Sequence, residues 1–165
     1  MPNTDKIVIN TAPIISVVAA LGDLNILQSL YNQVLVPLEV CQEILTGGTS
    51  GFGIAEFEAA FWLQKWQTPV NISPFLLNSL DSGEAAVIQL AINENVQTVC
   101  IDEATSRRVA RLSGLSVTGT VGILLRAKRE GYSISIQQSI QRMLARGIRL
   151  SKTVINSALE QAGES

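Results

Sequence analysis

The sequence predicts an α/β protein with a mostly parallel sheet and helices on both of its faces. Short apolar runs typical of buried strands alternate with segments of helical periodicity, and no Asn-Gly or Asp-Gly turn joins neighbouring strands as a hairpin. The composition agrees, because 47% of the residues are hydrophobic and 16% are charged, as in a packed globule. A length of 165 residues suits one domain, and we expect residues 1–165 to form it.

The first half of the chain begins with an apolar run at 6–9, which predicts a buried strand ending at Asn10. Pro13 suits the first turn of the next helix, and Gly22 ends that helix. The elements expected after it are a short helix capped by Asp23, a strand at 34–36, a helix after Pro37, a glycine-rich flexible loop at 46–53, a helix at 54–66 with apolar Phe57, Phe61 and Trp62, and a short strand at 69–72.

The second half continues the alternation of strands and helices. The elements expected in it are a helix from Asp81 to Ile92, a strand at 97–101, a helix at 104–112, a strand at 115–117, a helix at 120–130 closed by Gly131, and helices at about 135–146 and 151–161, the last capped by Ser151. Parallel strands need such helical crossovers, so this order favours βαβ units.

Several classes of chemistry are excluded by composition. The chain has no histidine, which removes Ser-His-Asp and Cys-His nucleophile pairs and His-bound zinc. Cys41 and Cys100 lie in apolar runs, so we expect buried free thiols in a reducing compartment. The apolar stretch 12–21 is too short to cross a bilayer, and no basic segment with a cleavage site precedes it. We therefore expect a cytoplasmic protein.

The charges are distributed unevenly along the chain. Residues 1–100 carry two basic and nine acidic side chains, whereas residues 101–165 carry ten basic and five acidic ones. Such a division suits a metal site beside a surface that binds phosphates. It equally suits a solvated helical face of Arg and Lys.

Two polar residues follow apolar strands, at the edge where open parallel sheets bind their ligands. Asn10 ends the first strand and Asp102 ends the strand at 97–101. If these strands are neighbours, both side chains reach one crevice. Each residue also has a local explanation, because Asn and Asp commonly begin turns.

Three further positions have both a structural and a functional interpretation. Glu43, one turn after Glu39, belongs either to an exposed acidic helix face or to the crevice. Asp81 and Glu84 form a helix-capping pair unless Glu84 points toward Asp102. The turn at 118–120 either uses Thr118 as an N-cap or offers backbone amides to a phosphate.

The order of these features resembles the PIN-domain family of Mg²⁺-dependent ribonucleases. The segments that carry the resemblance are VINTAPI (8–14), VPLEVCQEIL (36–45), LDSGEAAVIQLA (80–91) and TVCIDEATSRRVARLSGLSVTGTVGILLRAKREG (98–131). The last of them is the most specific, and it resembles a bacterial and archaeal branch related to VapC-type toxins. The resemblance runs from about residue 6 to about residue 160.

The resemblance implies a three-layer α/β/α fold with a five-stranded parallel sheet in the order 3-2-1-4-5. It also implies an acidic cluster that binds Mg²⁺ or Mn²⁺ and cleaves RNA. The implied catalytic and metal-binding residues are Asn10, Glu43, Glu84 and Asp102, with Glu103 as a water-mediated neighbour. The implied RNA-binding residues are Thr11, Arg107, Arg108, Arg111 and Thr118. The implied partners are RNA, a small antitoxin and a second copy of the chain. The near-apolar helices at 12–21 and 54–66 supply either the dimer surface or ordinary core packing.

Asn10 departs from the family pattern, which has an Asp at this position. An amide keeps one oxygen ligand but removes a negative charge, so we expect weaker metal binding and reduced or absent activity. The first hypothesis is thus a metal-dependent endoribonuclease, and the second is a weakened module that binds RNA or an antitoxin. A third, a doubly wound domain for a small phosphorylated ligand, lacks any glycine-rich phosphate loop.

Overall fold

The computed structural model describes residues 6–47 and 51–165. Five strands form one sheet in the order β3-β2-β1-β4-β5, and every neighbouring pair is parallel. The strands are β1 (Lys6–Ile9), β2 (Gln33–Val36), β3 (Gln64–Lys65), β4 (Thr98–Cys100) and β5 (Ser116–Thr118). Helices cover both faces, so the predicted three-layer architecture and strand order are confirmed.

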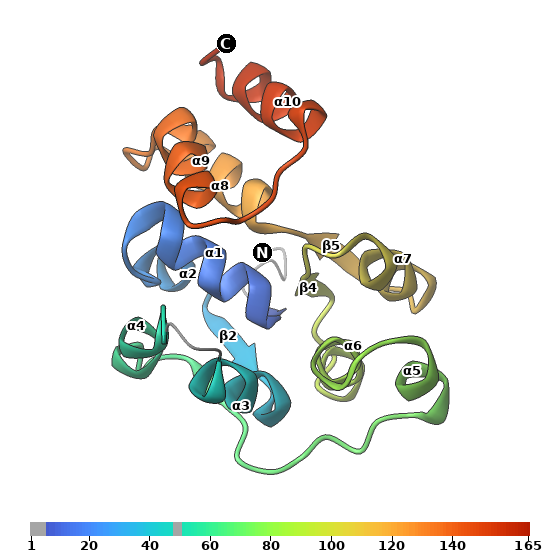
Figure 1. Ribbon diagram of the computed structural model, residues 1–165. Helices are drawn as coiled ribbons and strands as arrows, with labels where there is room; N and C mark the ends of the chain where they lie inside the picture. The colour runs from blue at the N-terminus through green and yellow to red at the C-terminus, as the bar shows by residue number, and fades with distance from the viewer. Residues whose placement is uncertain (1–5, 48–50) are drawn as a thin grey trace.

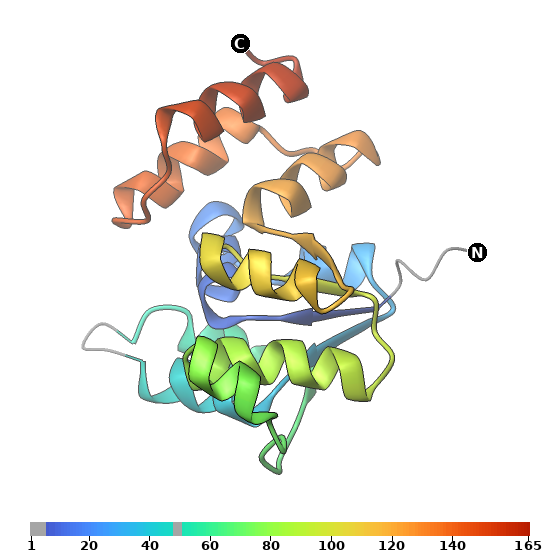
Figure 2. The same ribbon diagram turned by 90° about the vertical axis from the view of Figure 1, so that its right-hand side faces the viewer.

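Ten helices connect the strands or follow them in the described part of the chain. They are α1 (Thr11–Leu21), α2 (Asn25–Leu30), α3 (Leu38–Thr46), α4 (Ile54–Ala59), α5 (Pro74–Ser79), α6 (Ser82–Asn93), α7 (Ala104–Leu112), α8 (Thr120–Arg129), α9 (Ile136–Ala145) and α10 (Lys152–Ala162). Figure 1 shows α8 and α9 beside α1 with α10 beyond them, and α3, α5 and α6 on the opposite side. Figure 2 shows the strands running between these two groups.

The central strands are buried on both faces. Ile7, Val8 and Ile9 of β1 have no exposed surface, nor do Val99 and Cys100 of β4. A parallel sheet covered by helices needs such continuous apolar runs, which is why these segments read as strands in the sequence. Cys41 and Cys100 are both free and buried, as expected.

The third strand lies earlier than predicted. The sequence favoured 69–72, but β3 is Gln64–Lys65, paired with the end of β2. The amide of Val70 instead donates a hydrogen bond to Glu39 Oε2 on α3, 3.2 Å away. This bond holds the 69–72 segment against α3, so the Val70 amide is not available to pair with another strand.

The helix predicted at 54–66 is also shorter than expected, because α4 ends at Ala59. Phe57 is 1% exposed, whereas Phe61, one turn later, is 89% exposed. The chain leaves the helix at Ala60 so that 64–65 can pair with β2, and this pairing overrides local helix propensity. Part of the glycine-rich loop expected at 46–53 lies outside the described residues, namely 48–50.

The C-terminal helices build a second apolar cluster on α1. Ala19 and Ala20 of α1 pack with Leu124 of α8 and with Ile140 and Met143 of α9. The apolar face of α1 is therefore core, as the core-packing interpretation of helix 12–21 predicts, and a dimer through this helix stays a prediction. In the described ranges, no helix is long and apolar enough to span a membrane.

Candidate functional site

The ends of β1 and β4 meet at the edge of the sheet where ligands are expected. The amide of Asn10 donates to the carbonyl of Cys100 at 3.1 Å, which continues the ladder between the two strands. Asn10 is 7% exposed and is the N-cap residue of α1, although its side chain makes no capping hydrogen bond. The first position of the implied cluster is thus a buried neutral amide.

Glu43 is exposed on α3, but its carboxylate turns toward α1 and α6. Thr11 Oγ1 donates a hydrogen bond to Glu43 Oε1 at 3.1 Å. A Cβ atom added at Gly83, in the first turn of α6, would overlap the same oxygen. Partial burial of the carboxylate raises the pKa of Glu43, the Thr11 bond opposes this rise, and the charge of Asp81 adds to it. Three elements therefore meet at one carboxylate.

Glu84 lies beside this contact, half-buried in the first turn of α6. Asp81 caps the helix by accepting from the Glu84 amide at 2.9 Å, so the predicted capping role of Asp81 is confirmed. The carboxylate of Glu84 interacts with Ser106 of α7 and with Asp81. Burial raises the pKa of Glu84, the Ser106 hydrogen bond lowers it, and the charges of Asp81 and Glu103 raise it further.

Both carboxylate oxygens of Asp102 accept hydrogen bonds at the start of α8. The amide of Thr120 donates to Oδ1 at 2.8 Å, and the Thr120 hydroxyl donates to Oδ2 at 2.7 Å. The predicted N-cap at Thr118 is therefore wrong: Gly119 is the N-cap residue, and the capping oxygen comes from Asp102, 18 residues earlier. A Cβ atom at Gly119 would lie 2.7 Å from Asp102 Oδ1, which explains the glycine there.

Glu103 has a local structural role. It is the N-cap residue of α7, and its carboxylate accepts hydrogen bonds from the amides of Thr105 and Ser106 at 2.8 and 3.1 Å. These two bonds lower the pKa of Glu103. Glu103, which the resemblance implies as a water-mediated neighbour of the ion, therefore already uses its carboxylate to stabilise α7.

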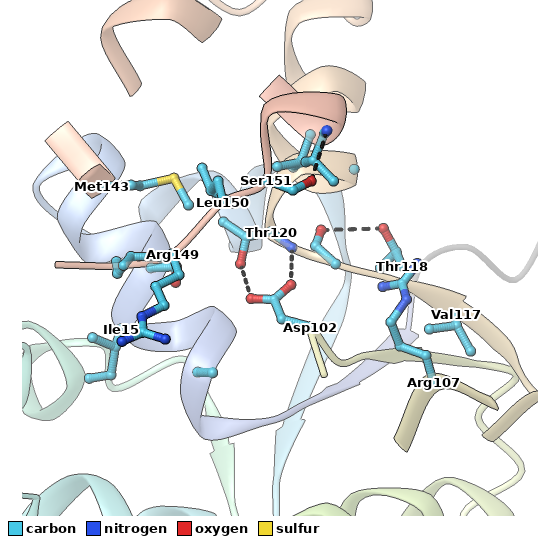
Figure 3. Close-up of a pocket in the computed structure, with 17 residues that line it drawn as sticks. Ile15, Asp102, Arg107, Val117, Thr118, Thr120, Met143, Arg149, Leu150 and Ser151 are labelled. Atoms are coloured by element: carbon cyan, nitrogen blue, oxygen red, sulfur yellow. Dashed lines mark hydrogen bonds between the residues drawn. The ribbon is translucent and has the colours of Figure 1, made fainter. Parts of the chain in front are cut away.

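A pocket of about 820 Å³ opens beside Asp102. Arg107 of α7 and Arg149, between α9 and α10, both line it, and Figure 3 shows them on either side of Asp102. Arg107 Nη1 donates to the carbonyl of Ile101 at 2.7 Å, which holds its guanidinium against the end of β4. A smaller pocket of about 360 Å³ contains Thr11, Glu43 and Arg146.

The structure separates the predicted basic residues. Arg107 and Thr118 line the larger pocket, whereas Arg108 and Arg111 are exposed and are not among its lining residues. Arg146 and Arg149 were missed because they lie in the last third of the sequence, outside every motif. The only sequence signal for them was the basic character of residues 101–165.

The carboxylates of Glu43, Glu84 and Asp102 and the amide oxygen of Asn10 are oxygen donors, which suit a hard divalent cation. Within residues 6–47 and 51–165, no three acidic or cysteine side chains gather into a ready metal cluster. Glu43 turns to Thr11, and Asp102 turns to Thr120. Mg²⁺ binds through one or two carboxylates and keeps several waters, so this arrangement fits a hydrated ion better than a closed cage.

A family model described as a PIN domain matches residues 6–164. The search of curated proteins found no match. The matched region covers nearly the whole chain, including all four positions of the implied cluster.

Proposed function

Because the chain belongs to the PIN-domain family, a nuclease-type fold, we propose that it is a Mg²⁺- or Mn²⁺-dependent endoribonuclease of reduced activity. The observation that carries this proposal is the contact of Glu43 with Thr11 and Gly83. It brings α3, α1 and α6 together at the ligand-binding edge of the sheet, where it orients the exposed Glu43 carboxylate.

The residues proposed to hold the ion are Asp102, Glu43 and Glu84, with the amide oxygen of Asn10 as a neutral donor. When bound, a divalent ion supplies a water of lowered pKa and offsets charge on the phosphodiester. Thr11 fixes the Glu43 carboxylate through its hydroxyl, and Thr120 fixes Asp102. Arg107 and Arg149 hold the RNA backbone on either side of Asp102.

Asn10 is the proposed cause of low activity. Replacing a carboxylate by an amide removes one negative charge beside the ion, and an amide does not accept a proton from the attacking water. Cleavage of single-stranded RNA in Mn²⁺ tests the proposal, with Asp102→Asn as the inactivating variant and EDTA as the metal-free control. Cleavage that persists in Asp102→Asn, or in EDTA, would show another source of activity.

A second candidate is a non-catalytic module that binds RNA or a small antitoxin. The observation that favours it is that both oxygens of Asp102 accept from Thr120, which leaves the end of β4 satisfied without a cation. RNA binding by a chain that shows no Mn²⁺-dependent cleavage would favour this candidate over the first.

We also propose the partners that the family resemblance implies, namely an antitoxin and a second copy of the chain. Phe61, which is 89% exposed, is the apolar side chain of the 54–66 segment most open to a partner. Sedimentation equilibrium of the wild type and of Phe61→Ser tests the dimer. A wild type that stays monomeric at high concentration would reject it.

A further inference from the structure

We propose, resting on the function proposed above, that the pocket beside Asp102 receives one nucleotide of a single-stranded RNA. The base enters the apolar interior, and the flanking phosphates lie at Arg107 and Arg149. The volume of about 820 Å³ lies within the range of small-molecule sites and exceeds what one base needs.

The walls of the pocket come from three parts of the fold. One wall is α1, another is β5 with the start of α8, and the third is the segment that joins α9 to α10. The apolar side chains that line it are Ile15, Val117, Val121, Met143, Ile148, Leu150 and Val154. Such walls favour a flat, weakly hydrated group such as a nucleobase over a free ion.

Positive charge borders the same pocket. Arg107 is half-buried and held by its bond to Ile101, whereas Arg149 is exposed. The first turn of α8 also lines the pocket through Val121 and Gly122, but there the Asp102 carboxylate already accepts from the Thr120 amide. The two guanidinium groups are therefore what favours an anion at the rim.

Ser16 supplies a polar group inside the pocket. It is 4% exposed and lies among the lining residues. A hydroxyl in an otherwise apolar wall favours a ligand that carries hydrogen-bonding atoms as well as an apolar surface. The edge of a nucleobase meets both requirements.

Continuity with Asp102 selects an RNA strand over other ligands. Asp102 lines this pocket, so a strand whose phosphodiester lies at Asp102 has its neighbouring nucleotide at the pocket mouth. An aliphatic peptide would use the apolar walls but would leave Arg107 and Arg149 without an anionic partner. A nucleotide has both groups: its base matches the apolar walls of the pocket, and its flanking phosphates match the arginines at the rim.

Equilibrium binding of a fluorescein-labelled, mixed-sequence RNA of eight nucleotides tests this proposal. Anisotropy is measured in EDTA, so that neither metal binding nor cleavage contributes. Val154→Trp fills the pocket from α10, and Leu144→Trp is the matched control, because the two residues are 41% and 43% exposed and Leu144 is outside the lining. We expect Val154→Trp to weaken the Kd at least tenfold and Leu144→Trp to change it less than twofold, with both folds checked by circular dichroism.

Arg149→Gln provides a second variant that does not touch the apolar walls. We expect it to weaken binding three- to tenfold and to reduce the salt dependence by about one released counterion. Arg129→Gln, at an exposed position on α8 outside the pocket lining, is the control and should bind as the wild type does.

Equal Kd values for Val154→Trp and Leu144→Trp would overturn the proposal, even if Arg149→Gln binds RNA more weakly. The RNA would then bind the basic surface without entering the pocket. A folded wild type that binds an acidic aliphatic peptide but no RNA would also overturn it. Cleavage is scored separately from binding. RNA that binds through the pocket but is not cut in Mn²⁺ would reject the nuclease alone, whereas cutting and binding unaffected by Val154→Trp would reject the pocket alone.

Discussion

Asp102 and Thr120 are joined by two hydrogen bonds, one from the Thr120 amide at 2.8 Å and one from its hydroxyl at 2.7 Å. The pair connects the end of β4 to the start of α8, although the two residues are distant in sequence. It also fixes the orientation of the carboxylate that the family resemblance places at the centre of the site. Asp102 therefore contributes to stability independently of any role in catalysis.

Asp102→Ala should lower the free energy of unfolding by about 1–2 kcal/mol, because it removes the capping oxygen of α8. Asp102→Asn keeps one acceptor oxygen and should cost less stability, yet it removes the charge needed for a cation. Urea unfolding measures both variants. Equal destabilisation by Ala and Asn would contradict the capping role.

Gly83→Ala should displace the Glu43 carboxylate, because the new Cβ would overlap Glu43 Oε1. We expect a cost of about 1 kcal/mol or less, because Glu43 Oε1 is the far end of an exposed side chain that can turn away. The same substitution in a Glu43→Ala background should cost much less, because the clashing atom is gone. A double-mutant cycle in urea measures the difference, and additive costs would show that the two residues do not interact.

Thr11→Val should reduce RNA cleavage about tenfold, because it removes a hydrogen bond to a charged carboxylate, a bond worth about 1.5–3 kcal/mol. Thr11 acts here as a positioning residue. Thr11→Ser keeps the hydroxyl and should restore most of the activity. The loss should fall on kcat rather than KM, and an unrescued loss in Thr11→Ser would point to packing instead.

Much of this arrangement was predictable from the sequence. The strands at 6–9 and 34–36 lie in short apolar runs, and helices rather than hairpin turns connect the strands. These two features predict a parallel sheet. The third strand was not predictable, because its two residues carry no apolar run and pair with β2 only through tertiary contact. The C-terminal end of α4 and the N-cap of α8 were not predictable for the same reason, since residues distant in sequence determine them.

The candidate site was predictable in position but not in detail. Asn10 and Asp102 follow adjacent strands, as their sequence pattern indicated. The partners of the acids were not predictable, because Thr11 and Thr120 reach them through side-chain orientation rather than spacing. Arg149 lies between two helices that no motif covers, so only the folded chain brings it to the pocket.

Glu164 anchors the C-terminus, and its role predicts a pH dependence. Its carboxylate accepts from Lys128 and from the amides of Ile136 and Gln137, which lowers its pKa from 4.5 to about 2. A carboxyl with a lowered pKa in the folded state stabilises above the unfolded pKa, and this contribution is lost as the pH falls from 4.5 toward 2.

Glu164→Gln should therefore cost about 1–2 kcal/mol at pH 7, a value reduced from the full shift because Glu164 and Lys128 are partly exposed. The cost should shrink to near zero at pH 2. Urea unfolding across this range measures it, with Glu160→Gln on the exposed side of α10 as the control. A cost that does not change with pH would show that the carboxylate charge is not responsible.

The comparison of Asn10→Asp with the wild type tests the metal-site account most directly. Single-stranded RNA is incubated with each protein at the same Mn²⁺ concentration, and initial cleavage rates are compared. The restored carboxylate adds a negative charge and a proton acceptor, so we expect Asn10→Asp to cleave at least about tenfold faster than the wild type. Equal rates in the two proteins, whether strong or absent, would contradict the claim that Asn10 limits a metal-dependent site.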